Sequence, residues 1–442
     1  MSIQLSDHFT YGKLFRFTLP SIIMLVFTSV YGVVDGFFVS NYAGKTSFTA
    51  VNFIMPFLMI LGCFGFMFGT GGGALIAKTL GEGKKEKANN LFSMIVYSSI
   101  IIGVILAVLG FLFIRPIARL LGADGELLEN CVTYGRIILI AIPAFTLQYE
   151  FQCLFATAEK AQLGLYITIA AGLTNIVLDA LFVGAFKWGL QGAAAATALS
   201  QCVGGIIPLI YFARPNSSLL QFGRFYFNGR SFLTVCGNGS SELATNISMS
   251  IVNMLYNTQL IKYAGEDGVA AYGVMMYVSM IFNAIFIGYS VGTSPAVSYN
   301  YGAENTEELK NLRKKSYFII GFFAAVMFIL AEALAKPLSK IFVGYDDGLL
   351  LLTLQGFMIF SFSFIFAGFV IFSSAFFTAL NNGLVSALIS FLRAFVFQIS
   401  TVLILPIIWK VNGIWISIVV AEFMAVIVSV LFLIGNKKKY HY

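Results

Sequence analysis

Charged residues are scarce in this sequence, and their scarcity excludes most soluble classes of protein. Asp, Glu, Lys and Arg make up 11% of the 442 residues, whereas an ordinary soluble domain has about 25%. A soluble chain of this length needs far more charge to cover its surface, yet 59% of these residues are hydrophobic. The composition therefore predicts an integral membrane protein.

Histidine and paired cysteine are also nearly missing. The two histidines, His8 and His441, stand near the ends of the chain, which excludes a histidine relay or a His-bound metal within the membrane. The five cysteines have no paired spacing, so we interpret them as small packing residues and not as disulfides or metal ligands. No set of nucleophile, base and metal ligands is visible, so we expect neither a cofactor nor an enzymatic activity.

Signals for nucleotide or nucleic acid binding are absent too. The glycines within residues 69–73 lie in an apolar stretch, and Lys78 follows them without a Ser or Thr in register, so there is no Walker A motif. The net charge of +7 comes from basic residues in short loops, and we expect no nucleic acid partner. No small-residue cleavage site precedes the first apolar stretch, which we therefore expect to remain as a helix.

Long apolar runs are what the sequence has in abundance. A helix needs ~20 apolar residues to cross the hydrocarbon core, and twelve stretches approach or exceed this length. With the N-terminus in the cytoplasm, 17 of the 27 Lys and Arg lie on the cytoplasmic side, nine lie outside, and Arg393 lies within a span. The positive-inside rule then predicts a multi-pass protein of the cell (inner) membrane with both termini in the cytoplasm. The predicted spans are 14–40, 50–77, 91–114, 131–158, 163–186, 189–212, 243–261, 269–297, 316–334, 349–380, 384–409 and 414–433.

The two halves of the chain resemble each other when the sequence is shifted by 221 residues, half of 442. In this register Gly71 meets Gly292 without any gap. Gly81 likewise meets Gly302. Each half holds six spans, an even number, so the halves share one orientation and form a parallel repeat. We predict an all-α membrane fold of two pseudo-symmetric six-helix bundles, divided into an N-lobe (residues 1–213), a cytoplasmic linker (residues 214–238) and a C-lobe (residues 239–442).

Acidic residues inside the predicted spans are the strongest functional signal, because a charge there costs ~2.5–3.5 kcal/mol even on insertion scales. Asp35 lies near the outer end of the first span. Asn175 and Asp179 share one face of the fifth span at i, i+4, and Thr197 lies in the sixth. All four are at similar heights in the outer half of the first bundle.

Two carboxylates, an amide and a hydroxyl at one depth form an all-oxygen site that suits Na⁺ or a proton. We therefore interpret these four residues as a cation-coupling site, and as the metal ligands if the ion is Na⁺. The alternative is a polar packing network. Such a network would more naturally occur in both halves, but the shift of 221 places Tyr256 and Ser400 where Asp35 and Asp179 stand.

Other intramembrane side chains are weaker candidates. Glu242, at the start of the seventh span, contacts either substrate or a cation, or is a solvated interfacial residue. Arg393 and Glu422 lie at comparable depth and are expected to pair, whereas Glu150 has no assignment. Methionines near the seventh and eighth spans either line an adaptable pocket or simply pack. The hinge and accessory candidates are Pro20, Tyr31, Gln201, Glu242, Met254 and Met276.

These features together resemble the multidrug and toxic compound extrusion (MATE) family over nearly the whole chain. The resemblance rests on the doubled six-helix halves and on Pro20, Asp35, Asn175, Asp179 and Thr197. It is closest to the prokaryotic branch that has its essential acids in the N-lobe. The resemblance implies that these residues bind Na⁺ or H⁺, that the first helix bends at Pro20, and that small organic cations leave the cell in exchange for the inward ion.

A C-lobe cation site is not expected. Glu242 resembles an acid in the seventh helix of another branch of the family. The acid that would partner it is not evident, because Tyr289, Tyr299 and Tyr301 stand in that region.

The predicted function is a secondary active multidrug antiporter that works by alternating access, as a monomer in the bilayer. The alternative is a lipid-linked oligosaccharide flippase of related architecture. That class should line its cleft with Arg and Lys, but here Arg393 alone lies well inside a predicted span. A third class, a membrane scaffold or receptor without transport, predicts no buried acids clustered at one depth.

Overall fold

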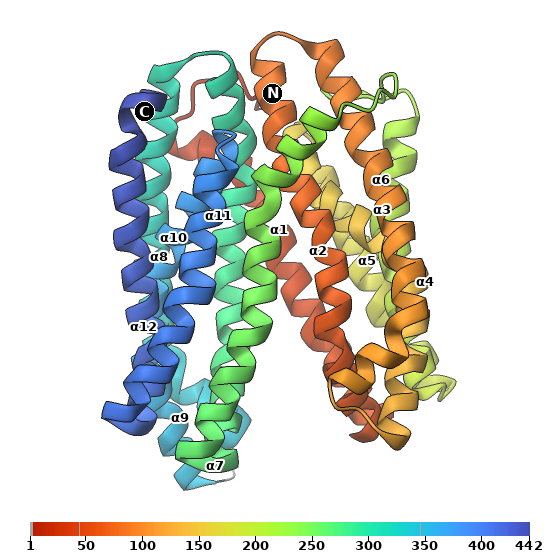
Figure 1. Ribbon diagram of the computed structural model, residues 1–442, viewed down its shortest axis with the longest axis vertical. Coiled ribbons are helices and arrows are strands. Elements are labelled where there is room, and N and C mark those ends of the chain that lie inside the picture. Colours follow the sequence, from red (N-terminus) through yellow and green to blue (C-terminus); the bar gives the residue numbers. More distant parts are fainter. Residues whose placement is uncertain (1–2, 44, 345) are drawn as a thin grey trace.

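The chain folds almost entirely into helices that lie side by side (Figure 1). The computed structural model describes residues 3–43, 45–344 and 346–442, and within these residues there is no β-strand. In chain order the elements are α1 (Tyr11–Phe38), the π-helix η1 (Val39–Ala43), α2 (Lys45–Gly81), α3 (Lys85–Leu120), α4 (Gly125–Thr157), α5 (Ala161–Asp179), the π-helix η2 (Ala180–Ala185), α6 (Gly189–Ala213), α7 (Gly229–Gly302), α8 (Thr306–Val343), α9 (Asp347–Phe360), α10 (Ser363–Ala379), α11 (Gly383–Phe391), the π-helix η3 (Leu392–Phe397) and α12 (Gln398–Tyr440).

Twelve membrane spans follow from these helices once two internal reversals are counted. Among the described residues, nine helices are each long and apolar enough to cross a membrane, and the bent pair α9 and α10 adds a tenth. α7 has 74 residues, about 110 Å if it were straight, whereas the hydrocarbon core is about 30 Å thick. Its path breaks at Gly265 (φ 66°, ψ −156°), where the green arm turns back as a teal arm (Figure 1). α12 breaks likewise at Lys410 (φ 51°, ψ −127°), so the prediction of twelve spans is confirmed.

Two predicted spans differ from the helices observed. The seventh was expected to begin at residue 243, but α7 begins at Gly229. Its first turns mix polar and apolar residues, and Val235 and Gly239 in them contact α2. The predicted span 349–380 is two helices, α9 and α10, which are bent by 45°. At the bend, the hydroxyl of Ser361 donates to the carboxylate of Glu332 on α8.

The predicted parallel repeat is confirmed by matching contacts between the lobes, α1–α6 (the N-lobe) and α7–α12 (the C-lobe). A Cβ added to Gly81 would lie 2.0 Å from the carbonyl oxygen of Tyr299, and one added to Gly302 would lie 2.0 Å from that of Lys78. Under the shift of 221, Gly81 corresponds to Gly302 and Lys78 to Tyr299. The same backbone contact therefore occurs twice, once from each lobe.

The lobes meet on the side of the membrane where both termini lie, here called the terminal side (top of Figure 1). Farther along α2, a Cβ on Gly71 would lie 2.1 Å from the carbonyl oxygen of Val235, and one on Gly239 would lie 2.0 Å from that of Met67. No side chain fits at such distances, so the backbones are in direct contact, as small residues allow in membrane helices. The lobes are closed against each other on the terminal side.

A short N-terminal segment also connects the lobes on the terminal side. The backbone N–H of Leu5 donates to Glu159 Oε1 at 2.6 Å, in the turn between α4 and α5. The N–H of Phe9 donates to Glu308 Oε1 at 3.0 Å, at the start of α8. Leu5 and Phe9 are both buried, so this segment contacts the N-lobe and the C-lobe at once.

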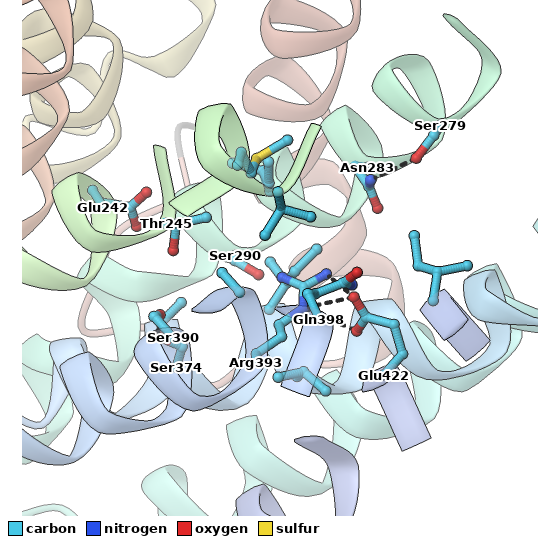
Figure 2. A pocket seen from close by; sticks show the side chains of 18 of the residues that line it. Glu242, Thr245, Ser279, Asn283, Ser290, Ser374, Ser390, Arg393, Gln398 and Glu422 are labelled. Atoms are coloured by element: carbon cyan, nitrogen blue, oxygen red, sulfur yellow. Dashed lines mark hydrogen bonds and ion pairs between the residues drawn. The ribbon is translucent and has the colours of Figure 1, made fainter. Parts of the chain in front are cut away.

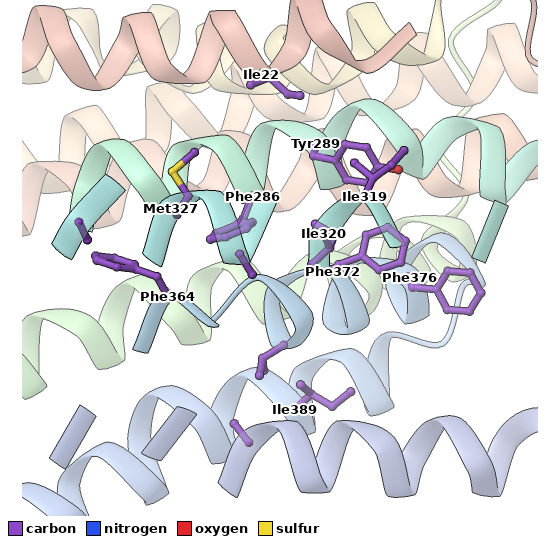
Figure 3. Packing of buried hydrophobic residues seen from close by; sticks show 14 of the residues in the cluster. Ile22, Phe286, Tyr289, Ile319, Ile320, Met327, Phe364, Phe372, Phe376 and Ile389 are labelled. Carbon is purple, nitrogen blue, oxygen red and sulfur yellow. The ribbon is translucent and has the colours of Figure 1, made fainter. Parts of the chain in front are cut away.

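Aromatic side chains fill the core of the C-lobe. Phe286, Tyr289 and Phe372 belong to one buried cluster, and Ile22 of the N-lobe helix α1 joins it (Figure 3). Gly288 permits this approach, because a Cβ there would lie 2.6 Å from Ile22 Cα. α1 therefore packs against both lobes, which is the position expected of a helix that connects their movements.

Candidate functional site

Four polar side chains from three helices converge inside the N-lobe. Asp35 lies near the end of α1, Asn175 and Asp179 in the last turns of α5, and Thr197 in α6. The two carboxylates and the amide are buried, with Asp35 8% exposed and Asp179 fully enclosed. Thr197 Oγ1 donates to Asp35 Oδ1 at 3.4 Å, and Asp35 lies close enough to Asp179 and Asn175 to interact with both. All the residues proposed for the cation site are thus together, and we call them the acid site.

The polar atoms of the acid site are under-satisfied. Both carboxylate oxygens of Asp179, and both side-chain polar atoms of Asn175, have no hydrogen-bond partner among the described residues. Buried groups of this kind are normally paired, because an unmade hydrogen bond or an uncompensated charge is costly. Two carboxylates side by side also repel each other when both are ionised. A proton or a small cation held between their oxygens would relieve both costs.

The donor set of the acid site consists of oxygen atoms, which suits a hard cation. No group of three His, Cys, Asp or Glu side chains that could hold a metal occurs in the described part of the chain. Carboxylate, amide and hydroxyl oxygens are the ligands of hard cations. The acid site therefore has the right atoms for Na⁺ or H⁺, and for no ion that needs nitrogen or sulfur.

Tyr134 of α4 is a member of the acid site that sequence reasoning missed. Its ring is fully buried, and its hydroxyl has no hydrogen-bond partner among the described residues. Asp35, Asp179 and Thr197 are its electrostatic neighbours. Nothing in the local sequence distinguishes this tyrosine from others in apolar helices. Its place beside the acids follows only from the packing of α4 on α6.

The helices that carry the acids both continue as π-helix. η1 follows α1 shortly after Asp35, and η2 begins directly after Asp179. A π-helical turn is wider than an α-helical turn and often marks a functional site. Both interruptions lie on the side of the acids away from the terminal side.

A second polar centre lies in the C-lobe (Figure 2). It is a cavity of about 200 Å³ lined by α7, α10, η3 and α12, with Thr70 of α2 at its N-lobe wall. Arg393 Nε donates to both carboxylate oxygens of Glu422 at 2.9 Å, and Nη2 lies 2.9 Å from Glu422 Oε1. The expected pairing of Arg393 with Glu422 is confirmed. Glu242 and Met276 line the same cavity.

A family model, MatE, matches the chain twice, over residues 20–181 and 243–404. Each match covers one lobe from its first span to its fifth. The chain belongs to the MatE family. As a member of a family of transporters, and with the spans described above, this MatE protein is a multi-span membrane transporter and not an enzyme.

Curated bacterial proteins resemble this MatE protein over most of their length. It is 23% identical over 430 residues to the multidrug export protein MepA of Staphylococcus saprophyticus, which covers 94% of this chain and 92% of the relative. It is 25% identical over 324 residues to MepA of Staphylococcus haemolyticus, which covers 73% and 72%. The resemblance to the MATE family is thereby confirmed.

Solved structures share the fold of this MatE protein. An outward-facing multidrug resistance MATE transporter superposes with a TM-score of 0.93 at 22% identity, covering 100% of this chain and 98% of the other. A transporter of the MOP superfamily from Pyrococcus furiosus, described as having a binding pocket of reverse polarity, superposes with a TM-score of 0.90 at 22% identity, covering 98% of both chains. The two-lobed architecture is therefore that of solved MATE transporters.

Two of the accessory candidates lie beside the acid site. Tyr31, one turn before Asp35, accepts a hydrogen bond from Gln148 Nε2 at 3.5 Å. Gln201, one turn after Thr197, is buried, and its Oε1 has no partner among the described residues. Farther along α1, Thr28 Oγ1 accepts from Gln152 Nε2 at 3.4 Å. Polar contacts between α1 and α4 thus continue from the acids toward the terminal side.

The remaining candidates are placed elsewhere. α1 is unbroken across Pro20, which is buried, so its role as a hinge stays a prediction. Met254 is 66% exposed and does not line the C-lobe cavity. Glu242 lies 13 residues into α7, about 20 Å from its start, and lines the C-lobe cavity, so its role stays a prediction. Glu150 is buried in α4 near Ser99, with neither carboxylate oxygen partnered among the described residues, and belongs to neither centre.

Proposed function

We propose that this MatE transporter exports small organic cations, with a broad drug spectrum, in exchange for inward H⁺ or Na⁺. The observation that carries the proposal is the acid site, in which Asp35 of α1 and Asp179 of α5 lie next to each other and both carboxylate oxygens of Asp179 have no hydrogen-bond partner among the described residues. The MepA relatives are named multidrug export proteins, which supports drugs as the class of substrate. The acid site supplies the coupling ion's ligands, and the protein needs no further cofactor.

Coupling requires that the ion bind one conformation better than the other, since only differential affinity shifts an equilibrium. A proton or Na⁺ bound between Asp35 and Asp179 reduces their charge and makes closer packing of α1 on α5 favourable. α1 then repacks, hinging near Pro20, where the backbone ladder lacks a hydrogen bond. The N-lobe interior shrinks, and a cationic substrate is released.

The proposed orientation places the terminal side in the cytoplasm of a bacterial cell. Seventeen of the 27 basic residues favour that side under the positive-inside rule. The closed contacts of Gly81 and Gly302 then lie on the cytoplasmic side, so the conformation described is one that faces outward. We propose that a single chain performs the whole cycle, because both lobes and the acid site belong to it.

The flippase alternative receives less support. A carrier of anionic lipid-linked sugars needs a net positive charge in its cleft, but Glu422, 2.9 Å away, balances the charge of Arg393. The acid site, moreover, would have no role in binding such a substrate.

The test is transport in proteoliposomes with each ion gradient imposed separately. Asp35→Asn and Asp179→Asn should each reduce gradient-driven ethidium export by about 100-fold or more, because a neutral amide cannot exchange a coupling ion. Asp124→Asn, which changes an exposed carboxylate in the loop before α4, is the matched control and should export at the parental rate. Folded, membrane-inserted Asp35 or Asp179 variants that export normally would refute the coupling role.

A further inference from the structure

The Arg393 side chain is held so that part of its guanidinium remains available. Nε and Nη2 both bond to Glu422, at 2.9 Å. Nη1 has no hydrogen bond to any described residue, although the side chain is only 16% exposed and lines the cavity. Guanidinium groups form their strongest bonds with carboxylates. The free edge therefore offers the cavity a donor for an anionic or carbonyl group.

Glu242 supplies the opposite charge. Its carboxylate lines the cavity from α7 and forms no hydrogen bond or ion pair with another side chain in the described part of the chain. Figure 2 shows Glu242 and Arg393 apart from each other, on different helices. The cavity thus presents one unpaired acid and, separately, one donor edge of a cation, so a ligand that satisfies both must carry two separated groups.

The rest of the cavity wall suits a compact aromatic body. Tyr256 and Tyr272 stack with their centroids 5.2 Å apart and their planes 1° from parallel, and Met276 adds a polarisable sulfur. Tyr256 is itself fixed, because its hydroxyl donates to Gln398 Oε1 at 3.0 Å. An aromatic ring between the two charged groups of a ligand would contact this wall.

We propose that the C-lobe cavity binds a small zwitterion, with its ammonium group on Glu242 and its carboxylate on the free edge of Arg393. This deepens the proposed function by adding a substrate class, and it rests on that function for the export step but not for binding. A simple cation would satisfy Glu242 alone. A simple anion would be repelled by Glu242 and by Glu422.

A matched pair of ligands tests the proposal. 4-(Aminomethyl)benzoic acid is a zwitterion with an aromatic spacer, and its methyl ester is a cation of nearly the same shape. Calorimetric titration of the purified full chain, without any ion gradient, should give the zwitterion about a tenfold lower Kd than the ester, the usual size of one charge-assisted hydrogen bond. Equal or weaker binding of the zwitterion would overturn the proposal.

Variants of the protein test which residue binds each charged group of the ligand. Arg393→Gln alone would leave Glu422 buried and unpaired, so the double variant Arg393→Gln/Glu422→Gln, which keeps the shape and removes both charges, is the one to use. It should bind both ligands with similar Kd, whereas Glu242→Gln should weaken both by about tenfold. Asp124→Asn should preserve the preference. A double variant that still prefers the zwitterion would exclude Arg393 as the partner of the ligand's carboxylate. Because no gradient is applied, a failure of ion coupling cannot produce that result.

Discussion

At the scale of single residues, the hydroxyl of Tyr134 is the smallest group whose removal probes the acid site. It is buried among Asp35, Asp179 and Thr197 without a partner of its own in the described chain. Since the phenol can donate to a carboxylate or offer an oxygen to Na⁺, it should contribute to ion binding more than to folding.

Tyr134→Phe should therefore raise the ion concentration needed for half-maximal export by about tenfold, equivalent to about 1–1.5 kcal/mol. The maximal rate at saturating ion should stay close to the parental value. The measurement is export from proteoliposomes over a range of outside pH and Na⁺. Tyr166→Phe, on a ring that is 65% exposed, is the control. An unchanged ion requirement in Tyr134→Phe would remove Tyr134 from the site.

At the scale of elements, closure of the terminal side depends on the glycines of α2 and α7. Any side chain at Gly81 or Gly302 meets a backbone carbonyl of the other lobe at 2.0 Å, which a helix cannot accommodate without moving away. The lobes then separate at this contact, and the conformation open to the terminal side is favoured.

Gly81→Val and Gly302→Val should each lower export below about a tenth of the parental rate, since alternation needs both conformations. In a background without the five native cysteines, a cysteine at Thr70, a residue in the wall of the C-lobe cavity, should react faster with an impermeant thiol reagent added at the terminal side. Gly435→Val is the control, because nothing lies within 4 Å of a Cβ there. Unaltered labelling and export in both variants would show that the contact is not a gate.

At the scale of the whole molecule, Glu159 connects the lobes through the N-terminal segment, which gives the closed state a pH dependence. Burial raises the pKa of the Glu159 carboxyl above its ordinary value, and Asp7 raises it further, while the Leu5 N–H and Lys160 act in the opposite direction. If opening exposes Glu159 to water, the closed state binds the proton more tightly. Acid at the terminal side then stabilises closure, and this stabilisation is lost as pH rises through the raised pKa.

Labelling of the Thr70→Cys reporter from the terminal side should thus become slower as the pH on that side falls toward the ordinary carboxyl range. Glu159→Gln, which mimics the protonated form, should label slowly at every pH. Glu82→Gln provides a control at the same side, because Lys84 holds the pKa of Glu82 below its ordinary value, so acid at this side protonates Glu82 less readily than Glu159. The same pH profile in Glu159→Gln as in the parent would assign the dependence to another group.

Much of this architecture is available from local sequence properties. Hydropathy predicts the spans because each must be apolar over the membrane thickness, and the match of Gly81 with Gly302 reveals the repeat because both lobes make the same backbone contact. Asp35 and Asp179 stand out because charge is rare in spans. The early start of α7 at Gly229 escaped prediction, since its first turns contain polar residues and hydropathy does not mark them as part of a span.

What the sequence by itself determined is therefore the number of spans, the doubling of the scaffold and the acids that it carries. Only the tertiary structure brought Tyr134 to those acids, placed an unpaired Glu242 in the same cavity as the Arg393–Glu422 pair, and closed the lobes at the glycines. The physical reason is that hydropathy and charge act along each helix, whereas the contacts of a site depend on the rotation and depth of helices relative to one another. Those are decided by close packing between helices, which no single segment encodes.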